Sequence, residues 1–219
     1  MNKSNEYFDI IAHAYDQATS EPGAWTPPDI VYENIKQYLS EESNVLDIGV
    51  GTGLSIDKVY KNTIFNLIVG VDVSKKMIEL CSDKYPKATL LQIKSLSEIS
   101  SFDINFGVVI CSGTLEFIDD IDALFCHVRK VQQPNDIFAF TYEPIVAFHI
   151  FQKDSKSLTV PNKESSLYIE DFYTYRYHSH DINRILKENG YSVIKDVEFV
   201  SYKKGEHNII YHAVVASAL

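Results

Sequence analysis

Short apolar runs alternate with amphipathic stretches through the middle of this chain. The apolar runs have the length and composition of buried strands and lie near 44–47, 67–72, 88–93, 106–112 and 136–142. The stretches after Gly53, after Ser74 and near 121–131 instead repeat apolar residues at helical spacing. Strands that alternate with helices predict an α/β fold built on a parallel sheet.

The N-terminal region carries two further helical patterns. Apolar residues recur at helical spacing within 7–17. Pro27 and Pro28 are suited to the first turn of a second helix, over 29–39, because proline needs no N–H partner there. Residues 1–40 are therefore expected to be helical and to lie outside the sheet.

The pattern changes after the fifth predicted strand. Residues 144–178 are rich in aromatic side chains and are interpreted as an insertion, helical in part. A helix over 179–188 follows, for which Ser179 is a suitable N-cap. The β-rich runs 191–201 and 207–217 predict a terminal hairpin, so that residues 179–219 form the final helix and hairpin.

The segment Val45-Leu-Asp-Ile-Gly-Val-Gly-Thr-Gly53 links the first strand to the first core helix. Its alternating glycines (Gly49, Gly51 and Gly53) permit a tight turn and let a ligand approach bare backbone, next to the N–H groups of a helix N-terminus. The third glycine comes one residue too early for the G-x-G-x-x-G pattern of dinucleotide folds. Asp47 would also repel a pyrophosphate, whereas it suits a ligand that carries an ammonium or sulfonium group.

A second acid, Asp72, ends the second strand. Its carboxylate can accept both hydrogen bonds from the 2′,3′-diol of a ribose. The same residue is also suited to cap the helix that follows, and the two roles are compatible.

These motifs, in this order, resemble those of the class I S-adenosylmethionine-dependent methyltransferases of the bacterial small-molecule type. The resemblance implies one methyltransferase domain over 1–219, with a Rossmann-like, doubly wound sheet of seven strands in the order 3-2-1-4-5-7-6 and a C-terminal antiparallel hairpin. Its cofactor-binding core is 43–142, where the resemblance is strongest. In that family the glycines pass under the methionine part of S-adenosyl-L-methionine, the first acid helps to place its amino group, and the second acid binds its ribose.

The resemblance also implies further cofactor-binding positions. These are Tyr15, Val73, Met77, Lys94, Ser95, Cys111 and Ser112. Met77 is equally suited to a plain core position. Lys94 stands where the family usually has an aspartate that accepts from the adenine amino group; lysine cannot accept, which leaves the backbone N–H of Ser95 for the ring.

The start of the chain has a family likeness as well. Tyr7-Phe-Asp-Ile-Ile-Ala-His-Ala-Tyr-Asp16 resembles an opening helix that covers the cofactor as a lid. The resemblance would place Tyr15 over the cofactor. The alternative is an amphipathic helix that covers a sheet edge.

The acceptor site is expected among the loops at the strand C-termini and in 144–178, which is predicted to be a substrate lid. The aromatic residues there suggest an apolar-walled pocket, or else a lid that packs on the sheet. His178 is the preferred catalytic base, with a surface or packing role as its alternative. Glu116, Tyr142 and Glu143 also follow strands at this edge.

Composition restricts the partners. The chain has 219 residues and a formal net charge of −10, which argues against a nucleic-acid substrate. No apolar run has the length of a membrane helix, and the first residues lack the apolar region of a signal peptide, so a cytoplasmic location away from membranes is expected. The scattered cysteines 81, 111 and 126 predict reduced buried thiols and no metal site.

We therefore predict an S-adenosylmethionine-dependent methyltransferase that acts on O or N of a small organic acceptor, with no prediction of its oligomeric state. Lys94 and the lack of an evident base motivate an alternative: a catalytically silent relative that binds the cofactor or a protein partner. A nicotinamide-dependent oxidoreductase is disfavoured by the glycine spacing.

Overall fold

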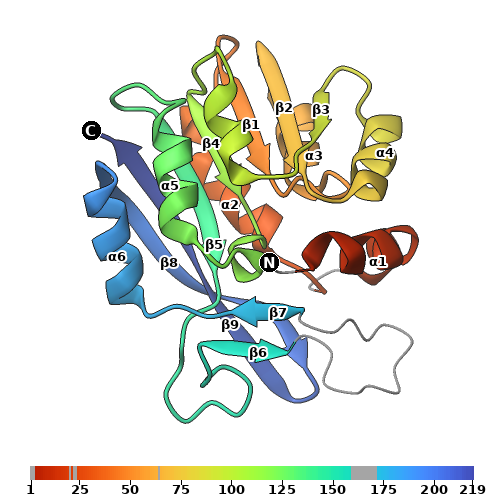
Figure 1. The fold of residues 1–219 in the computed structure, drawn as a ribbon, viewed down its shortest axis with the longest axis vertical. Helices are drawn as coiled ribbons and strands as arrows, with labels where there is room; N and C mark the ends of the chain where they lie inside the picture. The colour runs from red at the N-terminus through yellow and green to blue at the C-terminus, as the bar shows by residue number, and fades with distance from the viewer. Residues whose placement is uncertain (1–2, 20, 22–23, 64, 159–171) are drawn as a thin grey trace.

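Seven strands form the central sheet of the molecule (Figure 1). The computed structural model describes residues 3–19, 21, 24–63, 65–158 and 172–219. Along the sheet the strands run in the order β3-β2-β1-β4-β5-β9-β8. Their bounds are β1 Asn44–Ile48, β2 Leu67–Asp72, β3 Thr89–Gln92, β4 Val108–Cys111, β5 Ile137–Tyr142, β8 Tyr191–Lys204 and β9 His207–Ala218.

The first five of these strands are parallel, and the last two form the antiparallel hairpin. β9 pairs antiparallel with β5, with Ile137 opposite Ser217, and β8 pairs with β9 at the edge. The last strand of the chain therefore lies inside the sheet. This arrangement confirms the predicted seven-stranded fold and its strand order.

Helices cover both faces of the sheet. Their bounds are α1 Ser4–Thr19, α2 Pro27–Ile35, α3 Leu54–Asn62, α4 Lys75–Lys84, α5 Ile121–Arg129 and α6 Ser179–Glu188, with 3-10 helices η1 Lys36–Tyr38, η2 Leu96–Ser101 and η3 Leu115–Phe117. One core joins α2, α3 and α4 to the sheet, and a second core joins η2, α5 and α6 to its other face. α1 lies beyond the sheet, beside α4 (Figure 1).

Strand order reverses between β1 and β4, which lie next to each other while their following helices go to opposite faces. Open α/β sheets bind ligands at such a switch point, outside the carboxyl ends of the strands. The glycine turn after β1 and the loop after β4 meet there.

Two details differ from the sequence-based expectation. The described part of 144–178 contains no helix; strands β6 Lys156–Leu158 and β7 Tyr173–Tyr175 form a small antiparallel sheet, and 159–171 lie outside the described residues. Cys126 is exposed, because it faces outward from α5, whereas Cys81 and Cys111 are buried as predicted. No helix among the described residues is long and apolar enough to cross a membrane.

Candidate functional site

The three glycines of the turn after β1 all have positive φ angles, and they differ in what surrounds them. A Cβ at Gly49, where φ is +72°, would lie 2.2 Å from the hydroxyl oxygen of Thr114. At Gly53, where φ is +94°, it would lie 2.4 Å from the ring of Tyr85. At Gly51, where φ is +53°, the nearest atom is the Gly49 carbonyl oxygen at 4.0 Å. Gly49 and Gly53 thus permit close packing within the protein, whereas Gly51 leaves open space.

Asp72 connects the glycine turn to the next loop. Its carboxylate accepts hydrogen bonds from the backbone N–H of Gly51 at 2.9 Å and of Ser74 at 2.8 Å. Burial raises the pKa of Asp72, and the backbone hydrogen bonds oppose that rise. The N-cap of α4 is Ser74, whose hydroxyl accepts from Met77 N–H, so capping of this helix is not the role of Asp72.

Asp47 lies beneath the glycine turn. It is 1 % exposed, and its Oδ2 atom has no hydrogen-bond partner among the described residues. Burial, and then the charge of Asp72, hold the pKa of Asp47 well above its usual range. A buried carboxylate oxygen without a partner costs free energy, which agrees with the raised pKa of this group.

A cavity of about 740 Å³ opens at the glycine turn. Most of the predicted cofactor-binding residues line it, namely Tyr15, Gly49, Gly51, Asp72, Val73, Met77, Lys94, Ser95 and Ser112. Asp47, Gly53 and Cys111 do not line this cavity: the two side chains are buried behind its wall, and Gly53 packs against Tyr85.

Other lining residues were not predicted from the sequence. Phe8 and Trp25 come from the N-terminal region, Thr114 and Phe117 from the segment after β4, and His127 from α5. Phe8 belongs to the apolar stripe of the opening helix, which was a usable signal. No sequence motif around Trp25 or His127 indicates a role in the site, because each residue reaches the cavity only through tertiary packing.

The loop after β3 differs from the expected arrangement. The backbone N–H groups of Lys94 and Ser95 both donate to the carboxylate of Glu98, at 2.7 and 3.0 Å. Glu98 and Ser95 thereby form a capping box for η2. The Ser95 N–H that we expected to serve an adenine ring is therefore occupied by a side chain of the same loop.

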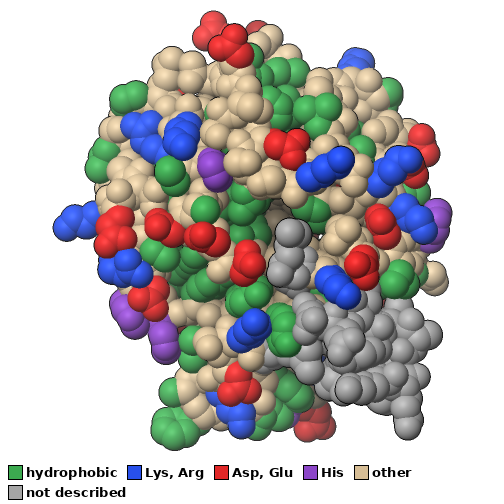
Figure 2. Space-filling view, viewed as in Figure 1, with side chains coloured by type: hydrophobic (Ala, Val, Ile, Leu, Met, Phe, Trp, Pro, Cys, Tyr) green, Lys and Arg blue, Asp and Glu red, His purple; other side chains and the backbone are tan. Residues whose placement is uncertain are grey.

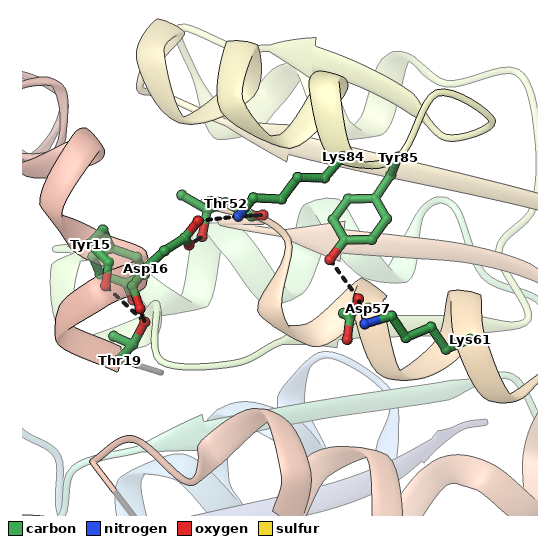
Figure 3. Close-up of polar contacts among 8 residues, drawn as sticks. All are labelled: Tyr15, Asp16, Thr19, Thr52, Asp57, Lys61, Lys84 and Tyr85. Carbon is green, nitrogen blue, oxygen red and sulfur yellow. Dashed lines mark hydrogen bonds and ion pairs between the residues drawn. The ribbon is translucent and has the colours of Figure 1, made fainter. Parts of the chain in front are cut away.

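Helix α1 is held to the cavity rim by two aspartates one heptad apart. Asp9 accepts from the Ser74 hydroxyl at 2.6 Å, and Asp16 accepts from the Thr52 hydroxyl at 2.5 Å. Figure 3 shows Asp16 directed from α1 toward Thr52 and toward Lys84 of α4, with which it forms an ion pair. Tyr15 lines the cavity beside this contact. Helix α1 thus forms part of the cavity wall, and its role as a lid stays a prediction.

A second cavity, of about 440 Å³, adjoins the first and shares Trp25 and Phe117 with it. Its wall combines acidic, basic and aromatic side chains. Those that matter for its chemistry are Glu116, Glu143, Asp154, Arg176, Lys204 and Tyr211.

Two buried glutamates in this second cavity differ in their partners. Glu143 forms an ion pair with Arg176 at 2.8 Å, and both side chains are nearly buried. Glu116 is 2 % exposed, and neither carboxylate oxygen makes a hydrogen bond within normal geometry to the described residues. Burial raises the pKa of Glu116 to about 7, an effect that the nearby Tyr211 hydroxyl and Arg176 partly offset.

His178, the predicted base, lies elsewhere. It is exposed at the start of α6 and stacks on His180, with ring centroids 5.2 Å apart. It lines neither cavity. The aromatic residues of β7 are half-buried, whereas His178 lies beyond the strand at the N-cap of α6. A base must reach the acceptor, so this position disfavours His178 in that role.

Comparison with known proteins supports the assignment of the fold. A methyltransferase domain family matches residues 46–140. An uncharacterized methyltransferase of Schizosaccharomyces pombe is 25 % identical over 103 residues, which are 42 % of this chain and 36 % of that protein. The chain spans no more than 36 % of the length of the curated relatives it matches.

Solved structures resemble nearly the whole chain. A methyltransferase from Methanosarcina mazei superposes with a TM-score of 0.70 at 16 % identity, covering 86 % of this chain and 98 % of that one. Magnesium protoporphyrin IX methyltransferase from Synechocystis, with bound S-adenosylhomocysteine, gives 0.62 at 17 % identity over 89 % and 82 %. The domain match places a methyltransferase-like segment at residues 46–140, and these likenesses show that the chain has the fold of the S-adenosylmethionine-dependent methyltransferases.

Proposed function

We propose that this protein transfers the methyl group of S-adenosylmethionine to O or N of a small organic acceptor. The observation that supports this most is the pair of adjoining cavities with Trp25 and Phe117 as their common wall. The first lies at the switch point of the sheet, and the second opens beside it. Two ligands, one in each cavity, can therefore approach each other at the junction marked by these shared residues.

The residues of the first cavity fit the family's cofactor. Gly51 leaves room for a ligand against the backbone. The Ser112 hydroxyl on the cavity wall has no hydrogen-bond partner among the described residues, and the same holds for the Oδ2 atom of Asp47, which is buried outside the cavity lining. Asp72 faces the cavity while its carboxylate holds Gly51 in place. The cavity volume lies within the range of small-molecule sites.

When bound, the cofactor supplies a methyl group on a sulfonium, which is transferred by in-line displacement. The residues of the chain mainly hold the methyl donor and the acceptor in alignment, and such alignment accounts for much of the acceleration of these reactions. Asp72 and the glycine turn orient one partner, and the aromatic wall of the second cavity orients the other. α1, fastened through Asp9 and Asp16, keeps water from the junction.

The volume and charge of the protein favour a small acceptor. The second cavity, about 440 Å³, holds a small organic molecule rather than a polymer. The net charge of −10 disfavours nucleic acid. On the face drawn in Figure 2, the described basic side chains are interspersed with acidic ones and form no continuous basic area.

One observation favours the alternative, a relative that binds the cofactor without transferring its methyl group. Lys94 cannot accept a hydrogen bond, and the neighbouring Ser95 N–H is occupied by Glu98. The loop after β3 thus offers little to the adenine amino group. Weak cofactor binding with no turnover would agree with this alternative.

Calorimetry with S-adenosylhomocysteine, followed by transfer from radiolabelled S-adenosylmethionine to a panel of small amines, phenols and alcohols, tests the proposal. We expect stoichiometric binding and labelled product. NAD serves as the control ligand and should not bind. No binding of S-adenosylhomocysteine would overturn both functions, and binding without transfer to any panel member would leave the silent relative.

A further inference from the structure

Glu116 is the buried carboxyl of the second cavity that forms no ion pair with the described residues. Three carboxyl groups line the cavity among the described residues (Glu116, Glu143 and Asp154), against two cationic groups, Arg176 and Lys204. Arg176 is paired with Glu143, and the Lys204 ammonium lies 4.3 Å from the centre of the Phe151 ring. Glu116 has neither an ion pair nor a hydrogen bond within normal geometry among the described residues, and the Tyr211 hydroxyl is the neighbour that lowers its pKa most.

Leaving a carboxylate in this state costs free energy. A buried charge is tolerated when it is paired, and otherwise its pKa shifts until it is neutral. Glu116 shows that response, because burial raises its pKa to about 7. A ligand that brings a positive charge and N–H donors would remove the penalty, whereas a carboxylate or phosphate would increase it.

The aromatic walls favour the same kind of ligand. The Trp25 ring lies 5.8 Å from that of Tyr202 and 5.9 Å from that of Tyr211, measured between centroids. Phe117 completes the wall toward the first cavity. Aromatic faces attract desolvated cations, with tryptophan the strongest. Rings beside an unpaired carboxyl are the combination that binds an ammonium group.

We propose that the acceptor is an amine, held by its ammonium group at Glu116 among these rings, and that Glu116 is the catalytic base that removes its proton. This inference rests on the proposed methyltransferase function and specifies its acceptor class. It replaces His178 by a side chain that lines the cavity next to the cofactor site.

The chemistry balances without any further reactant. One N–H proton of the ammonium moves to the Glu116 carboxylate and leaves a lone pair on nitrogen. That lone pair forms the new N–CH₃ bond as the C–S bond breaks, and the electrons of the C–S bond remain on sulfur as a thioether. The products are an N-methylated ammonium and protonated Glu116, which returns its proton to solvent as the product leaves.

The titration of Glu116 depends on groups from every element around it. These are Tyr15 on α1, Cys111 on β4, Glu143 after β5, Arg176 and Tyr177 after β7, Tyr202 on β8 and Tyr211 on β9. Arg176 is the one cation of this set, and it is already paired with Glu143. A ligand cation would therefore be the main new influence on Glu116.

The test measures two probes of similar shape, benzylamine and benzyl alcohol, by calorimetry. The protein is first saturated with S-adenosylhomocysteine, at a pH above 7 so that Glu116 is ionised. We expect benzylamine to bind at least about tenfold more tightly than benzyl alcohol. Glu116→Gln should remove that preference, while Glu206→Gln, which removes the same charge from an exposed position at the β8–β9 turn, should keep it.

A measurement on the wild-type protein keeps the inference falsifiable if Glu116→Gln does not fold. Benzylamine affinity should fall as the pH is lowered through 7, whereas benzyl alcohol affinity should stay constant. Equal affinities for the two probes, or a preference that Glu206→Gln also abolishes, would overturn the amine assignment. Because S-adenosylhomocysteine binding is measured first, its failure would instead indicate that the proposed function is wrong.

Discussion

The Asp16 carboxylate and the Thr52 hydroxyl form a hydrogen bond of 2.5 Å that joins the last turn of α1 to the glycine loop. Thr52 itself lies between Gly51 and Gly53, and it is 1 % exposed. The same carboxylate pairs with Lys84 at the end of α4 (Figure 3). Helix α1, the proposed lid, and the glycine turn are therefore coupled through one side chain.

Asp16→Ala should loosen the lid. The ion pair with Lys84 is partly exposed and contributes little, but the hydrogen bond to buried Thr52 contributes on the order of 1 kcal/mol. Hydrogen exchange of residues 4–19 should accelerate, and S-adenosylhomocysteine should bind several-fold more weakly. Exchange in the wild-type segment should slow when this ligand is added.

Asp29→Ala is the matched control, because Asp29 forms an ion pair of similar exposure with Lys58, away from α1. It should leave both measurements unchanged. If Asp16→Ala behaved like Asp29→Ala, Asp16 would not be the contact that holds the lid.

Gly49 and Gly51 should respond differently to alanine. At Gly49 the new Cβ would overlap Thr114, so Gly49→Ala should lower the melting temperature strongly. At Gly51 there is space, and the cost is that of the positive φ, about 1–2 kcal/mol. Gly51→Ala should thus fold but lose most of its affinity for S-adenosylhomocysteine, since its methyl group occupies ligand space. Thermal unfolding with calorimetry separates the two, and unchanged affinity in Gly51→Ala would place the ligand elsewhere.

Glu116 should make the stability of the protein depend on pH. Its folded pKa, about 7, lies above the ordinary value of 4.5. A carboxyl with a raised folded pKa stabilises the fold below its unfolded pKa, and this contribution is lost as the pH rises through the folded pKa. The wild-type protein should lose up to about 3 kcal/mol of unfolding free energy by this route between pH 4.5 and 7.

Glu116→Gln cannot titrate and should flatten this slope. Denaturant unfolding over the pH range measures the slope directly, and comparing slopes avoids the pH-independent cost of burying an amide. A mutant slope equal to that of the wild type would mean that Glu116 is ionised normally.

His178→Ala should have almost no effect. The imidazole is exposed, lines neither cavity and contacts His180. Turnover on any acceptor found in the panel, and affinity for S-adenosylhomocysteine, should both match the wild type. A large loss of turnover with unchanged affinity would restore His178 as a catalytic candidate.

The parts of the site that lie within one short segment were determined by the sequence itself. The glycine turn between β1 and α3 needs positive φ at alternate positions, and only glycine adopts this without strain. The position of Asp72 at the end of β2 could likewise be predicted from the residues next to it, because an apolar run of strand length precedes it. The strand order was implied by the resemblance of these motifs to a known family, and the structure confirms it.

Tertiary structure alone decided which glutamate is buried without an ion pair. Glu116 and Glu143 each follow a buried strand in the sequence. In the structure Arg176 forms its ion pair with Glu143, and Glu116 forms no ion pair with the described residues. Likewise, the sequence suggested that the backbone N–H of Ser95 could bind an adenine ring. In the structure the N–H groups of Lys94 and Ser95 both donate to the carboxylate of Glu98. The burial of a side chain and its charged partners depend on contacts between segments distant in the sequence. Burial and partners in turn set its pKa and its hydrogen bonds, so the proposal of an amine acceptor required the folded structure.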